Sequence, residues 1–527
     1  MTAKRSRTRP QPPPSPPTIS HKAFRTLIAE RSDELLRLAG YLERCRWDRP
    51  VFTRPLLGEL LHQSTELEEL LDAYNAGRNE RWHPFRSTMA AAKLFAGVNY
   101  ILLHIQHSLP RYRLLGIEGD FPAATEEAIL FTGEIILRVA RRLREQAEQL
   151  GLPVPDPSAC DGQYAEALPS GLLAGDRVPR HARGAEETVT YLATAFLNLA
   201  AESDLLHVPT RVQPEEYAAC IPKPISEEEL RQLLHKFHNL QSTYDTFVSD
   251  TDTEQQNTDL PVLRGHISVI FHLLRVAEAF SHYYERHVMT ADPKAPADRR
   301  PPVDGDALLK ALMDYSLVYA SRYLLRARDL CQSMLRRYAE VGEIEVIGPK
   351  YRGFHVRPAT LVAKIVRHYG SEVRMVVGGE EYDASSPMDI FRVNEKINAQ
   401  KRRWLMAQAE KLPIVRRREF SNDLANAVRS VVLALAERGN VVIYQRPLPI
   451  KPPDDVDNEK TPLQHILDEV KRLQATGMID IEADFRVQFV GDKRVLEDLK
   501  LLADSGYGED NFGNNVPLPT EISYLRR

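Results

Sequence analysis

The sequence is poor in cysteine and has no long apolar run. Its 527 residues include four cysteines, which form no C-x-x-C pair and have no regular spacing. This scarcity argues against a disulfide framework and against zinc-finger ligand sets, so we expect reduced thiols in a cytoplasmic protein. No uninterrupted apolar stretch approaches the ~18 residues that a membrane span needs, so we expect no membrane span.

A strong charge of one sign is also absent. The chain has 69 lysine and arginine residues against 73 aspartate and glutamate residues, which gives a formal net charge of −4. This near-neutral balance argues against a nucleic-acid or polyanion binder. The chain contains no P-loop, no dinucleotide-binding glycine fingerprint and no G-x-S-x-G motif. We therefore expect no cofactor, no nucleic-acid partner and no metal site.

The length exceeds that of a single ordinary core, and the first two thirds of the chain have a helical periodicity. Residues 1–20 are basic and rich in proline, which predicts a disordered tail. Apolar residues recur at helical spacing over 21–150 and 185–340, which predicts two helical domains or one shared bundle. The segment 151–184, rich in proline, glycine and aspartate, predicts a loop or linker between them.

From residue 342 the pattern changes to strands mixed with helices. "GEIEVIG" and "SEVRMVVGGEEYDA" alternate like strands, and a Gly-Gly pair turns the second into a hairpin. A long helix, the short strand "LPIVRRRE" and the helix "SNDLANAVRSVVLALAERG" follow. We therefore predict an α+β multidomain protein whose helical region precedes an open-faced sandwich of order β-α-β-β-α-β-α. The predicted boundaries are 341–446 for this domain, 447–460 for a linker and 461–527 for a small α/β segment at the C-terminus.

The stretch "GFHVRPAT", residues 353–360, places a histidine where the first helix of this domain begins. Pro358 is welcome in a first helical turn, because its missing N–H has no partner there. The free N–H groups and the dipole of such a turn favour an anion. Arg357 adds a bidentate donor for phosphate oxygens. An imidazole here is therefore suited to accept and release a phosphoryl group.

"GFHVRPAT" resembles the active-site motif of the HPr phosphocarrier proteins of the bacterial phosphoenolpyruvate-dependent sugar phosphotransferase system. The order of strands and helices from 342 to about 440 is similar as well, and the resemblance covers under a fifth of the chain. It implies that His355 is the phosphorylated residue and that Arg357 steadies the phosphate. It also implies a regulatory serine, Ser386 in "YDASSPMDIF", for which a plain helix N-cap is the alternative. The implied partners are an enzyme I-like phosphoryl donor protein and an unknown downstream protein.

Three functions remain open at this point. The first is a phosphocarrier or phosphorelay regulator, rather than a turnover enzyme, in which His355 signals to a helical scaffold. The second is a non-catalytic HPr-like docking module within a helical interaction protein. The third is a metal-binding helical enzyme domain that the HPr-like part regulates, with candidate ligand pairs at helical spacing in His235/His238 and Glu278/His282. The sequence does not specify an oligomeric state.

Overall fold

A computed structural model describes residues 18–44, 52–156, 185–292, 299–412, 424–450 and 462–526, together with a few single positions between these ranges. The chain divides into two compact units, each built from several segments. Unit 1 comprises Met1–Pro179, Leu205–Thr243 and Arg264–Leu324. Unit 2 comprises Arg180–Asp204, Tyr244–Leu263 and Leu325–Arg527.

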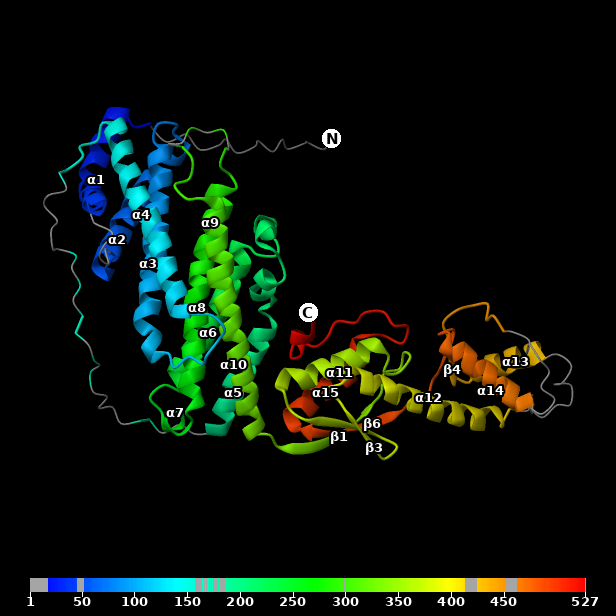
Figure 1. The fold of residues 1–527 in the computed structure, drawn as a ribbon. Helices are drawn as coiled ribbons and strands as arrows, with labels where there is room; N and C mark the ends of the chain where they lie inside the picture. The colour runs from blue at the N-terminus through cyan, green and yellow to red at the C-terminus, as the bar shows by residue number, and fades with distance from the viewer. Residues whose placement is uncertain are drawn as a thin grey trace, which may run out of the picture. The chain divides into compact units, whose positions relative to one another are not determined.

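Unit 1 is built from helices, as the periodicity of its sequence predicts. Helix α3 packs against α2 and α4, and α1 packs against α4 (Figure 1). The long helices that lie wholly or partly in this unit are α1 (His21–Arg44), α2 (Arg54–Ala73), α3 (His83–Ser108), α4 (Phe121–Leu150), α6 (Glu227–Phe247), α8 (Asp259–Tyr283) and α10 (Val318–Arg337). The short helix α9 (Gly305–Lys310) continues through a π-helical segment, Ala311–Leu317, into α10.

Helix α4 shows why these segments are helical. Asp120 caps its N-terminus by accepting the N–H of Ala123 at 3.0 Å, and its C-terminus ends at Gly151 with φ 70°. Its buried residues recur every three or four positions and include Ile136, Val139 and Leu143. This spacing places them on one stripe, which the neighbouring helices bury.

Two helical stretches have the length and apolar composition of a membrane span. They are His83–Arg111 and Asp259–Val288, and 67% of the most apolar window of each is buried inside the protein. The core helices of a helical bundle have the same composition, so these stretches do not establish a membrane span.

Unit 2 contains a four-stranded antiparallel sheet with the strand order β1-β6-β2-β3. Two further helices of this unit are α5 (Ala185–Ala201) and α7 (Asp252–Gln256). The elements that build and cover the sheet are β1 (Val341–Ile347), α11 (Val356–Tyr369), β2 (Val373–Val377), β3 (Glu380–Asp383), α12 (Pro387–Ala409), β6 (Arg486–Asp492) and α15 (Lys493–Asp504). Their order is strand, helix, strand, strand, helix, strand, helix, and β6 lies between β1 and β2.

The two faces of this sheet differ in polarity. Phe489 of β6 pairs with Ile344 of β1 on one side and Met375 of β2 on the other, and Phe489 and Met375 are both buried. Helices α12 and α15 pack on the sheet, and α11 packs against both helices (Figure 1). Pairs such as Arg486–Glu345, 3.0 Å apart, are exposed. The sheet therefore has one helix-covered face and one polar face.

The strand that completes the sheet differs from the prediction. The sequence placed all four strands and three helices within 341–446, whereas the structure takes the last strand and helix from β6 and α15. The segment expected at 461–527 is accordingly divided. Its first part joins a second small core. Strand β6 returns to the main sheet, where Val487 and Phe489 pair with β1 and Phe489 also pairs with β2.

The second core lies between α12 and β6 in the sequence. It contains α13 (Leu424–Glu437), β4 (Val441–Ile443), α14 (Pro462–Ala475) and β5 (Ile479–Ile481), with β4 and β5 paired antiparallel. Leu405 and Ala409, near the C-terminal end of α12, belong to the same cluster of buried residues. The long helix that the sequence predicted after the β2–β3 hairpin is therefore α12, a 23-residue helix that reaches from one core into the other.

Several predictions fall partly or wholly outside the described residues. They concern the disordered tail, the loop at 151–184, the strand "LPIVRRRE" and the linker at 447–460. The predicted boundary near 340 also differs from the observed division, because unit 2 includes α5 and the second half of α10. Helical periodicity shows that a segment is helical, but it does not show which core receives it.

Candidate functional site

The loop that leads to His355 is held by one side chain of α12. Arg352 and Gly353 have φ values of 53° and 62°, in the left-handed region. Asn394 accepts the N–H of Phe354 at 2.9 Å and donates to the carbonyl of Arg352 at 3.0 Å. A Cβ on residue 353 would lie 2.2 Å from the Asn394 Oδ1, so both the conformation and the close approach require glycine there.

Phe354 fixes the direction of the next side chain. Its own side chain is fully buried and meets the ring of Tyr507 edge to face at 5.4 Å. The Tyr507 hydroxyl donates to the carbonyl of Ile347 at 3.0 Å, which ties this aromatic pair to the end of β1. Because Phe354 is anchored in the core, His355 lies toward the surface, with 26% of its side chain exposed.

His355 is the N-cap residue of α11, as the sequence predicts. Its backbone is extended, with φ −69° and ψ −175°, and its side chain makes no capping hydrogen bond. Pro358 stands in the first turn, and the N–H of Ala359 donates to the His355 carbonyl at 3.1 Å. The imidazole is therefore free of a capping role at a helix end that favours anions.

A buried carboxylate from the C-terminal region holds the imidazole. The Nε2 of His355 lies 2.8 Å from Oε1 of Glu509, whose side chain is only 3% exposed. The ring of Tyr351 meets the imidazole edge to face at 5.7 Å. A carboxylate beside Nε2 can accept a hydrogen bond from this nitrogen. Among the residues that the structure describes, none donates a hydrogen bond to Nδ1.

Arg357 is held from the same region. Its guanidinium donates to the side-chain oxygen of Asn515, and Asn515 pairs with Glu509 in an antiparallel bridge. The N–H of Val516 donates to the carbonyl of Gly508 at 3.0 Å and extends this pairing. Residues 508–516 therefore form a small hairpin, called the C-terminal hairpin below, whose two facing residues contact the histidine and the arginine of the motif.

The turn of the C-terminal hairpin is built by Asp510. Its carboxylate accepts the N–H groups of Phe512 at 2.8 Å and Asn514 at 2.9 Å. The hydrogen bonds from Asn514, its side-chain amide first, hold the pKa of Asp510 below its usual value. The C-terminal hairpin therefore has a defined turn.

The chain beyond the hairpin is anchored on α11 and α15. The ring of Tyr524 stacks on His368 at 3.9 Å, and its hydroxyl donates to Asp498 at 2.6 Å. Burial raises the pKa of Asp498 and lowers the pKa of His368 to about 4. The C-terminal hairpin lies between α15 and Tyr524 in the sequence. The contact of Tyr524 with Asp498 of α15 therefore holds the chain on both sides of the hairpin.

Ser386 does not lie beside His355. It is the N-cap of α12, and its hydroxyl accepts the N–H of Asp389 at 3.3 Å. The carbonyl of the adjacent Ser385 accepts from Arg367 Nε at 2.7 Å, at the last turns of α11. Arg367 is twelve positions after His355, so about 18 Å of helix separates the two regions. The capping role of Ser386 is present, and its regulatory role stays a prediction.

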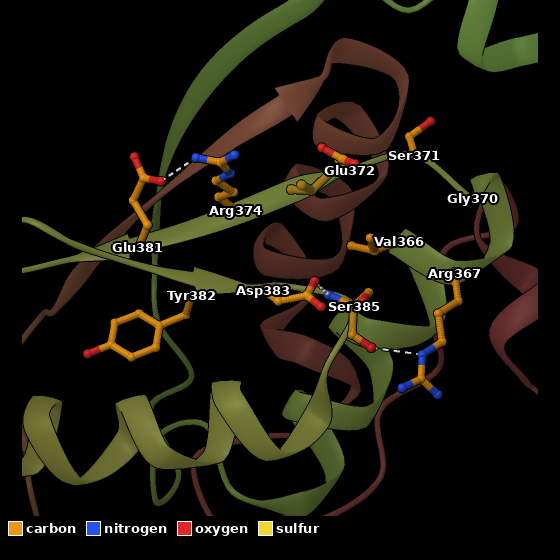
Figure 2. A pocket seen from close by; sticks show the side chains of 11 residues that line it. Val366, Arg367, Gly370, Ser371, Glu372, Arg374, Glu381, Tyr382, Asp383 and Ser385 are labelled. Atoms are coloured by element: carbon orange, nitrogen blue, oxygen red, sulfur yellow. Dashed lines mark hydrogen bonds and ion pairs between the residues drawn. The ribbon is translucent and has the colours of Figure 1, made fainter.

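A cleft of about 670 Å³ lies beside Ser385 (Figure 2). Figure 2 shows Arg374 paired with Glu381 and Arg367 bonded to the Ser385 carbonyl. Charges of both signs line the cleft, and His355 is not among its lining residues. The cleft therefore offers no single preference for an anion or a cation.

Three of the four candidate metal ligands of the helical region are engaged in other contacts. Glu278 pairs with Arg231 at 3.1 Å, and His282 lies 3.0 Å from Glu227. The ring of His238 lies 5.4 Å from that of Phe271. In the part of the chain that the structure describes, no group of three or more His, Cys, Asp or Glu side chains is placed to hold a metal ion.

Comparisons with known proteins give no relative. No protein-family model, no curated protein and no solved structure matches this chain. Function must therefore be argued from the site itself. The sequence pointed to His355 and Arg357 as candidates, but it did not indicate Glu509 and Asn515, which contact them, or Asn394, which holds the preceding loop. The only sequence signal for Glu509 and Asn515 is the turn-forming composition of "GEDNFGNN".

Proposed function

We propose that unit 2 carries an HPr-like phosphoryl-acceptor domain and that His355 is its acceptor. In this proposal a phosphorylated, enzyme I-like donor protein transfers its phosphoryl group to His355, and a downstream protein then removes it. The observation that carries the proposal is the environment of His355 at the mouth of α11. The imidazole is partly exposed, it does not cap the helix, and a buried carboxylate orients it.

The element order supports the same proposal. The HPr-like arrangement expected from the sequence is β-α-β-β-α-β-α, and the four-stranded sheet with α11, α12 and α15 has this order. Its histidine stands at the start of the first helix, which is the position that the motif requires. The insertion of a second small core after α12 leaves this order intact.

Arg357 supplies a charge for the incoming phosphate. It stands in the first turn of α11, two residues after His355, and its present partner is the neutral amide of Asn515. A phosphate oxygen is a stronger acceptor than an amide oxygen, because charge-assisted hydrogen bonds are roughly twice as strong as neutral ones. Arg357 is therefore expected to exchange Asn515 for the phosphate when His355 is loaded.

Exposed apolar side chains next to the histidine and on the first turns of α12 suit a protein partner. Val356 is 71% exposed, and Met388 and Phe391 of α12 are 63% and 46% exposed. Helix α12 runs antiparallel to α11, because the hydrogen bonds of Ser385 and Asn394 lie at opposite ends of α11. Phe391 therefore lies nearer than Met388 to the end of α11 that carries His355. Apolar residues beside a reactive group favour docking of another protein over a small molecule.

The inserted core contacts the loop that precedes the histidine. Arg352 donates its backbone N–H to Asp480 at 2.8 Å and its side chain to the carbonyl of Gly477 at 3.1 Å. Tyr351, whose ring edge faces His355, also meets the ring of Tyr444 at 5.1 Å. We propose that a downstream protein bound to this core senses the state of His355 through these contacts.

Phosphoryl transfer to the full-length chain tests the proposal. The protein is incubated with phosphoenolpyruvate and a general enzyme I, and its intact mass is followed. We expect one acid-labile phosphate that is absent from His355→Ala. His62→Ala is a matched control, because His62 also faces a glutamate, Glu66 at 3.7 Å, but on an exposed helix surface. No phosphate, or a phosphate that persists in His355→Ala, would favour the non-catalytic docking module instead.

A further inference from the structure

A groove on the inserted core has an apolar floor and a basic rim. Its volume is about 470 Å³, and it lies between α13 and the chain that continues from β4. Leu433, Ile443 and Leu448 supply its apolar lining, whereas Arg429 and Arg446 stand exposed beside them. Leu448 belongs to the buried cluster of this core and Ile443 packs against it, so the groove reaches down to the core itself.

The two arginines of this rim have no counter-charge. In the part of the chain that the structure describes, neither Arg429 nor Arg446 makes an ion pair or a side-chain hydrogen bond. Residues 424–450 contain three arginines against one acidic residue, Glu437, although the whole chain has a formal net charge of −4. The positive charge is therefore local. An apolar groove between unpaired cations favours an occupant that is both apolar and acidic.

Strand β4 presents an unpaired edge beside this groove. Asn440 and Tyr444, which flank β4, each make a backbone hydrogen bond of 2.9 Å with a residue that flanks β5. Directions alternate along an antiparallel ladder, so the N–H and C=O groups of Val441 and Ile443 point away from β5. Among the described residues, none makes a hydrogen bond to these outward groups. Such an edge is a template for one more strand, and Ile443 also lines the groove.

We propose that the inserted core binds an extended, acidic and apolar peptide segment of a partner protein as a third strand beside β4. The backbone of this segment pairs with the outward groups of Val441 and Ile443, which is recognition by strand addition. Side chains alternate along a strand, so an apolar side chain enters the groove while acidic neighbours lie near the arginines of the rim. The inference gives a chemical class to the downstream protein, and in this respect it rests on the proposed function.

Two other occupants fit this edge less well. Pairing of β4 with β4 of a second copy would bring the unpaired arginines of both copies together, which like-charge repulsion opposes. The segment "KPPDDVDNEK", residues 451–460, is acidic and follows the groove in the sequence. It consists largely of proline, aspartate and asparagine, which are depleted in strands, and proline has no N–H to give to a ladder. A segment from a partner protein is therefore the favoured occupant.

Binding of a synthetic peptide to the full-length chain tests the proposal. The probe is a fluorescein-labelled peptide of about a dozen residues whose centre alternates glutamate and leucine, and its matched control has lysine in place of glutamate. We expect only the glutamate peptide to bind. Exposed ion pairs are modest, so Arg429→Gln and Arg446→Gln should each weaken binding by about 2- to 5-fold and the double variant by about 4- to 25-fold. Arg438→Gln should leave binding unchanged, because Arg438 is exposed after α13 but does not line the groove.

Hydrogen exchange separates strand addition from simple charge attraction. The peptide should slow exchange of the Val441 and Ile443 amides by roughly tenfold or more, whereas the Val442 amide, which already faces β5, should not change. Two further peptides are N-methylated on alternate residues, each on one of the two sets. Only the set that faces β4 should lose binding. Equal binding of both methylated peptides, or binding without slower exchange at Val441 and Ile443, would overturn strand addition.

The other occupants give distinct results. A variant with Asp454→Asn, Asp455→Asn, Asp457→Asn and Glu459→Gln neutralises the acidic segment of this chain. If the peptide binds this variant but not the wild type, the chain's own segment occupies the groove and the proposal is overturned. A dimer in sedimentation analysis, with the Val441 and Ile443 amides protected before peptide is added, would assign the edge to a second copy and also overturn it.

Peptide binding needs no phosphoryl transfer, so the fate of this inference is separable from that of the proposed function. If enzyme I and phosphoenolpyruvate do not load His355 but the glutamate peptide binds as expected, the docking site stands and the carrier function is overturned. If His355 is loaded and neither the wild type nor the neutralised variant binds the peptide, the carrier function stands and the docking site is overturned. Circular dichroism spectra and melting curves check that each variant is folded.

Discussion

Replacing Asn394 with alanine removes the side chain that holds the loop before His355. Asn394 accepts the buried N–H of Phe354 at 2.9 Å and donates to the carbonyl of Arg352 at 3.0 Å. Leaving a buried N–H without a partner costs ~1–3 kcal/mol. Loss of the second bond costs ~0.5–1.5 kcal/mol, because the exposed Arg352 can bind water instead. We expect Asn394→Ala to weaken the closed loop by about 2–4 kcal/mol in total.

Hydrogen exchange of the Phe354 amide measures this loss directly. At ~1.4 kcal/mol for each tenfold, exchange of this amide should be roughly 30- to 1000-fold faster in Asn394→Ala under native conditions. Asn394→Asp keeps the acceptor for Phe354 but loses the donor to Arg352. The exchange rate of the Phe354 amide in this variant should therefore lie between those of the wild type and Asn394→Ala. Phosphoryl transfer to His355 should be slower in Asn394→Asp than in the wild type and slowest in Asn394→Ala, because the loop orients the imidazole.

A matched control stands one turn along the same helix. Asn398 lies four residues after Asn394 and accepts from Gln474 of α14 at 3.3 Å, so Asn398→Ala truncates a similar side chain without touching the loop. Equal exchange rates for the Phe354 amide in the two alanine variants would refute the reasoning. So would unchanged exchange in Asn394→Ala together with a normal rate of phosphoryl transfer.

Two further predictions concern the two ends of α11. Gly353→Ala forces a left-handed residue to carry a Cβ that would lie 2.2 Å from Asn394, so we expect a loss of at least ~1–2 kcal/mol in the free energy of unfolding, seen as a lower melting temperature. Unchanged melting would contradict the left-handed turn. His368 has its pKa lowered from 6.5 to about 4 by burial, so the folded state disfavours its charged form. The stability that it contributes is complete above pH 6.5 and is lost as the pH falls toward 4, at up to ~3 kcal/mol. The drop in melting temperature from pH 7.5 to pH 5 should therefore be smaller in His368→Gln, and an equal drop in both proteins would contradict the burial of His368.

The sequence predicts those parts of the site that depend on neighbouring residues. "GFHVRPAT" places His355 at an N-cap with Arg357 and Pro358 in the first turn, and the structure has this arrangement. The hairpin of β2 and β3 turns at Gly378 and Gly379, as the Gly-Gly pair predicts. Caps and tight turns are determined within a few residues, so their chemistry is visible in the local sequence.

The partners of these residues could not be predicted, because they come from distant parts of the chain. Glu509 is 154 residues from His355 in sequence, and its own neighbours suggest only a turn. Apolar and polar residues alternate along β6, as they do in both edge strands and central strands. The local sequence therefore does not show that β6 inserts between β1 and β2. Asn394 lies on a helix whose polar residues are mostly solvated. Such pairings depend on the overall chain topology, which short-range patterns do not encode.

The most direct test of the account is to locate the phosphate on the loaded chain. The full-length protein is treated with phosphoenolpyruvate and enzyme I, digested at neutral pH, and sequenced by tandem mass spectrometry. We expect a phosphate on His355 within residues 353–364, stable in base and lost in acid. A phosphate on another histidine, an acid-stable phosphate on Ser386 alone, or an unmodified segment 353–364 would contradict it.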